Sequence, residues 1–418
     1  MRRSFSFIAS LFAARAAARA THRAEQNRRG KQFLRSAVLD LLEERQLLAT
    51  FTYNGGTGLL TIETSQNNEA FTILSSSDSG NYTITSNFNF SGSNTTGLTG
   101  AGTGTLTVGS NINNLTRILI TNNAANSGSS LSFGLSTGNF VDGLTVNFTN
   151  STSGTINVAN SAGFINGANL SLTTTGNAIT VSSRISANSS GSVTLNSRNI
   201  QVTGNITTIS GGIALYGNGA GAYQSGSFNG VSIIGPNVNV TSTSGNIQVN
   251  GRGAGDSADY GINLDQAWVE TGSSGLINLT GVSGNGTDNA YGIFANYSNL
   301  RISNGALNVS GTSNGTGANS TGLYLKTSTF SSANTSTFTI TGSAANGTTN
   351  ATGIFANSSN ITSSAVNVTG TSSGTGANSR GLYLLSSTVN SRGSTAVTFT
   401  GNATNGTTNT YGVFASSS

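Results

Sequence analysis

The chain has 418 residues, and its composition is far from that of an ordinary globular domain. Charged residues make up 7% of it, against about 25% in a typical soluble domain, and it contains 56 glycines, one proline and no cysteine. The lack of cysteine excludes disulfide bonds and thiolate chemistry. The sequence contains no run of 18 apolar residues, so we expect no membrane span.

The formal charge of +5 is concentrated at the N-terminus. Residues 1–50 carry ten basic and four acidic side chains, a net of +6, whereas the other 368 residues carry eight and nine, a net of −1. A nucleic-acid-binding surface needs a basic stripe with interleaved aromatic residues, and residues 51–418 contain none. We therefore expect no nucleic-acid partner and interpret residues 1–50 as a short, helical basic leader.

The leader ends in the sequence LLEERQLLA at residues 41–49, directly before the first expected strand. This segment resembles the LEPR-XLL leader of large repetitive exported proteins of planctomycete bacteria, with Glu44 in the place of the proline. The matching positions are Leu42, Glu43, Arg45, Leu47 and Leu48. The resemblance implies export and a secreted or cell-surface location. Alternatively, the same segment is an amphipathic helix that caps the fold.

Strand-like segments are dense but irregular from residue 51 to residue 150, for example LLTIET at 59–64. We expect this part to be the irregular N-terminal end of a solenoid, or its cap, and residues 151–418 to form the solenoid itself. The stretch GNITTISGGIALYGNGAG from Gly204 resembles the β-helices of filamentous haemagglutinin and of autotransporter passenger domains.

The most regular part of the chain, from position 246 to position 418, is an internal repeat. The pattern Gly-apolar-X-apolar recurs at nearly equal intervals, at Gly261, Gly292, Gly322, Gly353, Gly381 and Gly412. A second strand-like segment runs in phase and ends at Gly251, Gly281, Gly311, Gly342, Gly370 and Gly401. Self-similarity at a period of this size indicates a solenoid or another repeat array.

Both segments alternate apolar and polar residues, which is typical of half-buried strands. A third short strand-like stretch lies between them, and Gly and Asn, which tolerate left-handed backbone, fill the connections. No helical periodicity follows residue 50. We therefore predict an all-β protein, a parallel β-helix (β-solenoid) with coils of roughly 20 to about 31 residues, a usual length for a solenoid repeat.

An aromatic ladder is the first candidate functional feature. The third position of the Gly-apolar-X-apolar pattern is Asn263 in the first repeat, and then Phe294, Tyr324, Phe355, Tyr383 and Phe414. If the flanking aliphatic residues face inward, these rings face outward and offer a contact surface for glycans or for cell-surface or matrix proteins. Alternatively, loops cover the rings, or the rings fill the core.

Catalytic chemistry has little support in the sequence. The one histidine, His22, lies in the leader, and no motif for a metal or a cofactor occurs. Three aspartates, Asp256, Asp259 and Asp265, form the one local acidic cluster, beside Arg252 and Glu270. Several carboxylates can bind a hard cation such as calcium, but we expect a polar turn there. We thus expect no catalytic residue, no metal and no cofactor.

These observations predict a non-catalytic, exported surface protein with a structural or adhesin-like role. One alternative is an enzyme like the β-helical polysaccharide lyases and hydrolases. Another is an ice-binding solenoid, because threonine and asparagine alternate along the outer columns. Since Ser418 falls early in a new coil, we also expect either a longer parent protein or end-to-end self-association.

Overall fold

The computed structural model describes residues 25–26, 28 and 49–418, apart from 65–67, 76–79, 113, 123–131, 136–137, 150–152, 220–225, 256–258 and 394. The chain divides into two units, Met1–Leu47 and Leu48–Ser418, and the second contains all the described strands. In the first unit Glu25, Gln26 and Arg28 are helical, and the leader motif at residues 42–48 lies outside the described residues. Within the described part of the chain, no helix has the length and apolar character of a membrane span.

The N-terminal strands of the second unit form antiparallel hairpins. The strand pairs β1–β2, β3–β4, β4–β7 and β6–β7 are all antiparallel. Their bounds are β1 (Ala49–Asn54), β2 (Leu59–Thr64), β3 (Ala70–Ser75), β4 (Tyr82–Ser86), β5 (Phe90–Ser91), β6 (Leu98–Thr99) and β7 (Thr105–Val108). Beyond them β2 and β3 pair in parallel with β8 and β9, so the hairpins continue directly into the coils.

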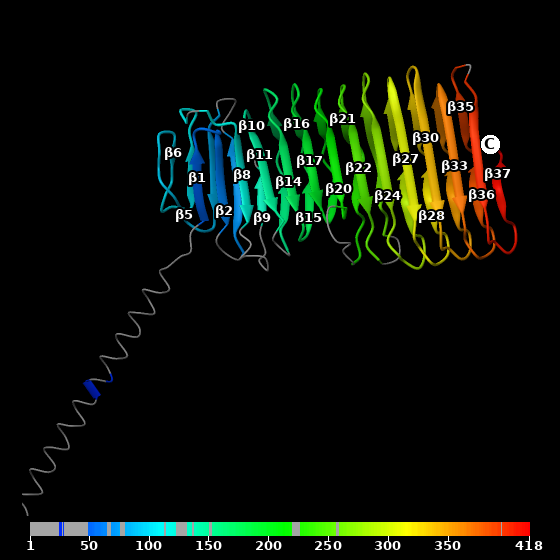
Figure 1. The fold of residues 1–418 in the computed structure, drawn as a ribbon, viewed down its shortest axis with the longest axis horizontal. Helices are drawn as coiled ribbons and strands as arrows, with labels where there is room; N and C mark the ends of the chain where they lie inside the picture. Colours follow the sequence, from blue (N-terminus) through cyan, green and yellow to red (C-terminus); the bar gives the residue numbers. More distant parts are fainter. Residues whose placement is uncertain are drawn as a thin grey trace, which may run out of the picture. The chain divides into compact units, whose positions relative to one another are not determined.

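From β8 onward the chain winds into a parallel β-solenoid with three strands in each coil (Figure 1). The first strands form one stack: β8 (Arg117–Asn122), β11 (Gly143–Phe148), β14 (Leu170–Thr174), β17 (Val193–Ser197), β20 (Ile213–Gly217), β22 (Ile247–Arg252), β24 (Ile277–Val282), β27 (Gly305–Ser313), β30 (Ser336–Ala344), β33 (Ala365–Ser372) and β36 (Val397–Ala403). Neighbours pair in parallel: Val193 pairs with Ile213 in a short coil, and Ile277 pairs with Leu307 in a longer one. The coils therefore lengthen toward the regular C-terminal part.

The second and third strands form two further parallel stacks. The second strands are β9 (Ser132–Leu135), β12 (Thr155–Val158), β15 (Ala178–Val181), β18 (Asn199–Val202), β25 (Tyr291–Asn296), β28 (Thr321–Lys326), β31 (Thr352–Asn357), β34 (Arg380–Leu385) and β37 (Tyr411–Ser416). The third strands are β10 (Gly138–Phe140), β13 (Ala162–Phe164), β16 (Ile185–Ala187), β19 (Ile206–Thr208), β26 (Asn299–Ile302), β29 (Thr329–Ser332), β32 (Asn360–Ser363) and β35 (Thr388–Ser391). The long strands β21 (Val231–Ser242) and β23 (Ile262–Thr271) belong to both stacks. The predicted parallel β-helix is confirmed.

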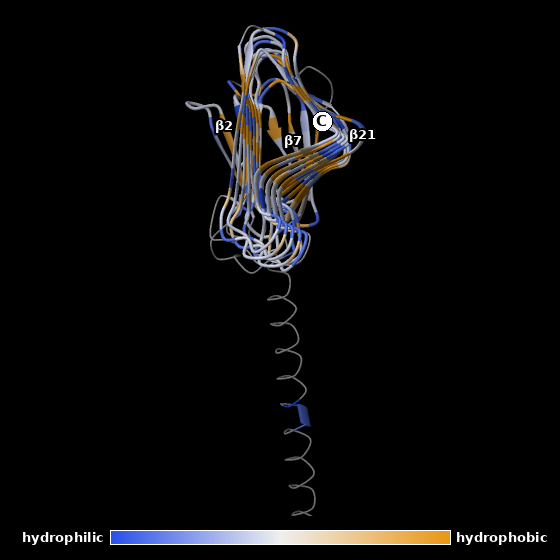
Figure 2. Cartoon of the chain, turned by 90° about the vertical axis from the view of Figure 1, so that its right-hand side faces the viewer, coloured by the Kyte–Doolittle hydropathy of each residue, from blue (hydrophilic) through white to orange (hydrophobic). Residues whose placement is uncertain are grey.

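The core runs through the inside of the coils as columns of apolar side chains. In one coil Ile277, Leu279, Ile293, Ala295 and Leu300 are all fully buried. Seen along the coils, the apolar residues gather in the strands, and the loops are more polar (Figure 2). Burial of these alternate positions is the main stabilising term, because each apolar residue is removed from water on folding.

The antiparallel hairpins are joined to the first coils by a buried tyrosine. The hydroxyl of Tyr82 donates a hydrogen bond to Asp142 at 2.8 Å and accepts the backbone N–H groups of Val141 and Asp142, each at 3.2 Å. The ring of Tyr82 stacks on Phe140, which in turn stacks on Phe164, with centroid distances of 5.5 and 5.0 Å. Burial raises the pKa of both Tyr82 and Asp142 above their ordinary values.

The two series of in-phase glycines meet where the first and second stacks approach each other. A Cβ atom on Gly311 would lie 2.1 Å from the carbonyl oxygen of Gly322, and one on Gly322 would lie 2.3 Å from the backbone nitrogen of Ser343. The neighbouring coils repeat this contact, for example between Gly342 and Gly353. Both glycines of the repeat are therefore required by backbone-to-backbone packing.

We expect Gly311→Ala to destabilise the solenoid by about 1–3 kcal/mol, the usual cost of inserting a methyl group into a packed interior. The clash is with backbone, which cannot rotate away as a side chain would. Thermal unfolding followed by circular dichroism measures the effect. Gly393→Ala is the control, because its Cβ atom would meet nothing closer than 3.6 Å. Equal midpoints for the two variants would contradict this explanation.

A column of buried serines holds the corner between the second and third stacks. The residues before them have left-handed backbone, with φ of 47° at Tyr297 and 49° at Thr327. The hydroxyl of Ser328 donates to the carbonyl oxygens of Lys326 and Ala295, at 3.0 and 3.1 Å, and accepts the N–H of Ser298 at 3.1 Å. The column consists of the buried Ser298, Ser328, Ser359 and Ser387, together with Ser418, which is exposed.

We expect Ser328→Ala to lower the free energy of unfolding by about 1–3 kcal/mol, because the buried N–H of Ser298 loses its acceptor. Ser274→Ala is the matched control, since Ser274 is exposed in a bend. Denaturant unfolding of the two variants measures the difference. Identical transitions would show that the serine column does not stabilise the corner.

Candidate binding groove

The structure places the predicted aromatic ladder on the outside of the second stack. The aliphatic residues on either side of each ring, such as Ile293 and Ala295, are fully buried, whereas the rings are half-buried. The ring centroids of successive coils lie 5.3, 4.8, 4.6 and 5.2 Å apart along Phe294, Tyr324, Phe355, Tyr383 and Phe414. The alternative in which these rings fill the core is therefore wrong.

The central rings of the ladder cover one another. Phe355 is nearly parallel to both its neighbours, with interplanar angles of 13° to Tyr324 and 8° to Tyr383. Stacked rings shield each other's faces from water and from ligands. The middle of the ladder therefore presents mainly ring edges and tyrosine hydroxyls, and its stacking supports the register of the coils.

We expect Phe355→Ala to destabilise the protein by about 1–3 kcal/mol, because two stacked pairs of about 0.5–1.5 kcal/mol each are lost. Phe355→Tyr is the conservative control, since tyrosine occupies the equivalent positions 324 and 383 and preserves the stack. Thermal unfolding compares the two. An alanine variant as stable as the tyrosine variant would show that stacking contributes nothing.

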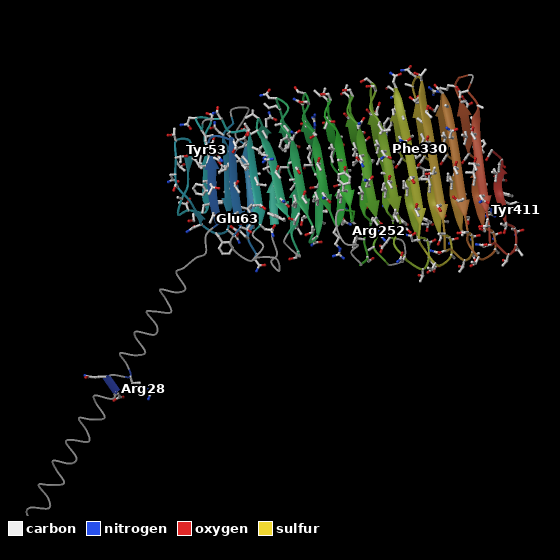
Figure 3. The ribbon with its side chains drawn as sticks, viewed as in Figure 1. Arg28, Tyr53, Glu63, Arg252, Phe330 and Tyr411 are labelled. Atoms are coloured by element: carbon white, nitrogen blue, oxygen red, sulfur yellow. The ribbon has the colours of Figure 1, made fainter. Side chains whose placement is uncertain are left out.

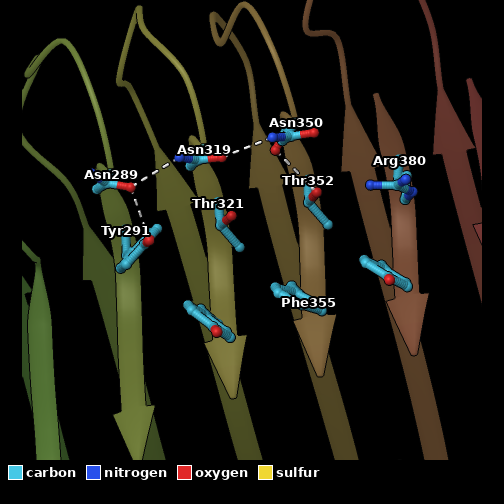
Figure 4. A pocket seen from close by; sticks show the side chains of 10 residues that line it. Asn289, Tyr291, Asn319, Thr321, Asn350, Thr352, Phe355 and Arg380 are labelled. Atoms are coloured by element: carbon cyan, nitrogen blue, oxygen red, sulfur yellow. Dashed lines mark hydrogen bonds between the residues drawn. The ribbon is translucent and has the colours of Figure 1, made fainter. Parts of the chain in front are cut away.

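A ladder of asparagine amides runs beside the rings, at the start of the second strands. Asn289, Asn319, Asn350, Asn378 and Asn409 have left-handed backbone, with φ between 53° and 59°. From Asn319 onward, the side-chain nitrogen of each donates to the side-chain oxygen of the asparagine one coil before it, at 3.0–3.1 Å. Figure 4 shows two of these bonds. The ladder fixes the orientation of every amide.

A third column separates the amides from the rings, and it changes in size along the solenoid. Its members directly precede the repeat glycines and are Tyr260, Tyr291, Thr321, Thr352, Arg380 and Tyr411. Thr321 and Thr352 are small, and their side chains lie deep, with 4% and 3% of their surface exposed. The last member, Tyr411, lies in the final coil and is 38% exposed (Figure 3).

The two threonines leave a groove of about 340 Å³ on the outer face of the second stack. Thr321 and Thr352 form its floor, and Tyr291 and Arg380 close its ends (Figure 4). Its two sides are the amides of Asn289, Asn319 and Asn350 and the rings of Tyr324, Phe355 and Tyr383. The groove therefore combines amide donors and acceptors, aromatic carbon and one positive charge.

The charge of Arg380 is held against two rings. Its guanidinium carbon lies 4.5 Å from the ring centroid of Tyr383 and 5.3 Å from that of Phe414. Among the described residues no carboxylate forms an ion pair with Arg380, whereas Arg301, for example, pairs with Glu270 at 3.7 Å. Arg380 is therefore available to an anion from outside the chain.

Tyr291, at the opposite end, remains a neutral hydrogen-bonding group. Burial raises the pKa of its phenol above the ordinary value, and the neighbouring Tyr260 and Tyr324 raise the pKa further. Its hydroxyl donates to the side-chain oxygen of Asn289 at 3.4 Å. One end of the groove is thus neutral and aromatic and the other is cationic.

The structure describes two of the three aspartates of the predicted acidic cluster. Asp256 lies outside the described residues, and Asp259 is buried before the strand β23. Asp265, further along β23, accepts a hydrogen bond from the amide of Asn296 at 2.8 Å. Across the described part of the chain, no three His, Cys, Asp or Glu residues lie close enough together to hold a metal ion.

The fold and the groove define the class of this protein: it is a parallel β-solenoid repeat protein with an aromatic and amide-lined outer face. No protein-family model, no curated protein and no solved structure matches the chain.

Sequence reasoning found the rings but missed the amide ladder, the serine column and the groove. The signal for the groove was present in the repeat itself. Aligning the residues before the repeat glycines places two threonines between Tyr291 and Arg380, where other coils have tyrosine. A column that changes from large to small and back to large predicts a depression on the surface.

Proposed function

We propose that this protein is a non-catalytic, exported surface module, in which the solenoid is a rod that binds glycans or cell-surface or matrix proteins. The observation that carries the proposal is the groove on the outer face, with amides on one side and rings on the other. Such mixed polar and aromatic linings are characteristic of sites that hold small or extended ligands.

The chemistry of the lining supports the non-catalytic part of the proposal. Glycoside hydrolysis generally needs a pair of carboxyl groups about 5–9.5 Å apart. The side chains that line the groove are asparagine, threonine, tyrosine, phenylalanine and one arginine. These groups are suited to binding.

The export part of the proposal rests on the leader. The resemblance at Leu42, Glu43, Arg45, Leu47 and Leu48 supports it, together with the charge contrast between residues 1–50 and the neutral repeats. Mass-spectrometric mapping of the termini in surface, culture and cytosolic fractions tests it. We expect surface peptides that begin near Ala49. An intact basic N-terminus confined to the cytosol would contradict export.

We expect the full chain to bind one or more members of a panel of polysaccharides and matrix proteins without altering them. Thr321→Tyr should weaken this binding at least tenfold, because a tyrosine there fills the groove. Tyrosine is the residue of the preceding coil at this position, so the fold accommodates it. Thr335→Tyr, in an exposed bend, is the matched control.

The same incubations test the enzymatic alternative. New reducing ends, or the ultraviolet absorbance of unsaturated uronates, would reveal hydrolase or lyase activity and contradict the proposal. Equally strong binding by the wild type and the Thr321→Tyr variant would show that the groove is not the binding site.

A further inference from the structure

We infer that the groove between Tyr291 and Arg380 binds a short acidic glycan segment, with a sugar carboxylate against Arg380 and a sugar ring against Tyr291. This inference rests on the proposed binding function and specifies its ligand. Three features carry it: the length of the gap, a tyrosine ring at one end of it and an arginine without an acidic partner at the other.

The length of the groove is set by the spacing of the coils. Tyr291, Thr321, Thr352 and Arg380 occupy the same position in four successive parallel coils. Coils lie about 4.8 Å apart, so the backbones of Tyr291 and Arg380 are about 14 Å apart. The two side chains occupy part of this distance. The groove between them has a volume of about 340 Å³, which matches a ligand of about disaccharide size.

Tyr291 offers aromatic carbon at one end of this gap. Tyr260 stacks on its ring from the preceding coil, with centroids 5.1 Å apart and an interplanar angle of 16°. Tyr324, from the next coil, meets the ring at 84° with centroids 5.4 Å apart. The equivalent position of the next coil is the small Thr321, so the part of Tyr291 that Tyr324 leaves uncovered lines the groove. Aromatic carbon suits the apolar C–H surface of a sugar ring.

Arg380 offers a charge at the other end. The rings of Tyr383 and Phe414 lie against its guanidinium group, and its Nε atom is buried without a hydrogen-bond partner among the described residues. A planar guanidinium group binds carboxylates through paired hydrogen bonds. Because residues 51–418 carry a net charge of only −1, the attraction for an anion is local to this residue.

The amides along the side of the groove provide the remaining contacts. Within the ladder Asn319 and Asn350 each use one N–H and one oxygen lone pair. An asparagine amide has two N–H donors and two lone pairs, so each retains a donor and an acceptor. Evenly spaced groups of both kinds match the hydroxyls of a sugar chain better than the largely apolar core of a protein interface.

The test uses the full chain on a glycan array that contains uronic-acid oligosaccharides and the same oligosaccharides with their carboxyl groups reduced. We expect binding to at least one uronic-acid glycan and at least tenfold weaker binding to its reduced form. Calorimetric titration of the best ligand should show at least a tenfold loss for Arg380→Gln. Arg301→Gln, on the third stack, is the matched control and should bind like the wild type.

Circular dichroism checks that each variant is folded, and Arg380→Lys, which keeps the charge, should recover part of the affinity. If the reduced glycan binds as tightly as the acidic one, and Thr321→Tyr abolishes this binding, the ligand need not be acidic. The inference would then be wrong, and the proposed binding function would stand. If Arg380→Gln leaves uronic-acid binding unchanged, the sugar carboxylate does not bind at Arg380. Binding to no glycan and no matrix protein would end both proposals.

Discussion

Parallel pairing of equivalent residues in successive coils is the constraint on which the rest of this structure depends. Gly281 pairs with Gly311, and Gly311 with Gly342, so every position of the repeat lies directly beside its own copy. Side chains of one kind therefore meet at the strand spacing: amides bond amides, and rings stack on rings. A shift of one residue would turn the apolar columns toward water and disrupt all the ladders together.

The same constraint explains the neutral composition. In a register that brings like residues together about every 4.8 Å, a column of charged side chains would repel itself along the whole solenoid. Asparagine, serine and threonine avoid this repulsion, because each can donate and accept hydrogen bonds within its own column. The low fraction of charged residues, 7%, is thus a condition of the stacking, and Arg380 is an exception to it.

Periodicity was sufficient to predict the coils, the strands in each coil and the outward rings, because burial of alternate residues has a direct trace in the sequence. It could not predict side-chain geometry. Nothing in the repeat indicates that Phe355 lies nearly parallel to both its neighbours, or that the amide of Asn350 bonds that of Asn319. Nor could it predict that Asp265 would accept a hydrogen bond from the amide of Asn296 in the next coil.

The residue that directly precedes each repeat glycine affects how the groove can evolve. The position accepts tyrosine, threonine or arginine while the paired strands keep the same register. A single codon change at this position can lengthen, shorten or close the groove by one coil, and duplication of a coil pair can copy it. The groove can therefore change in discrete steps of one coil while the backbone register is kept.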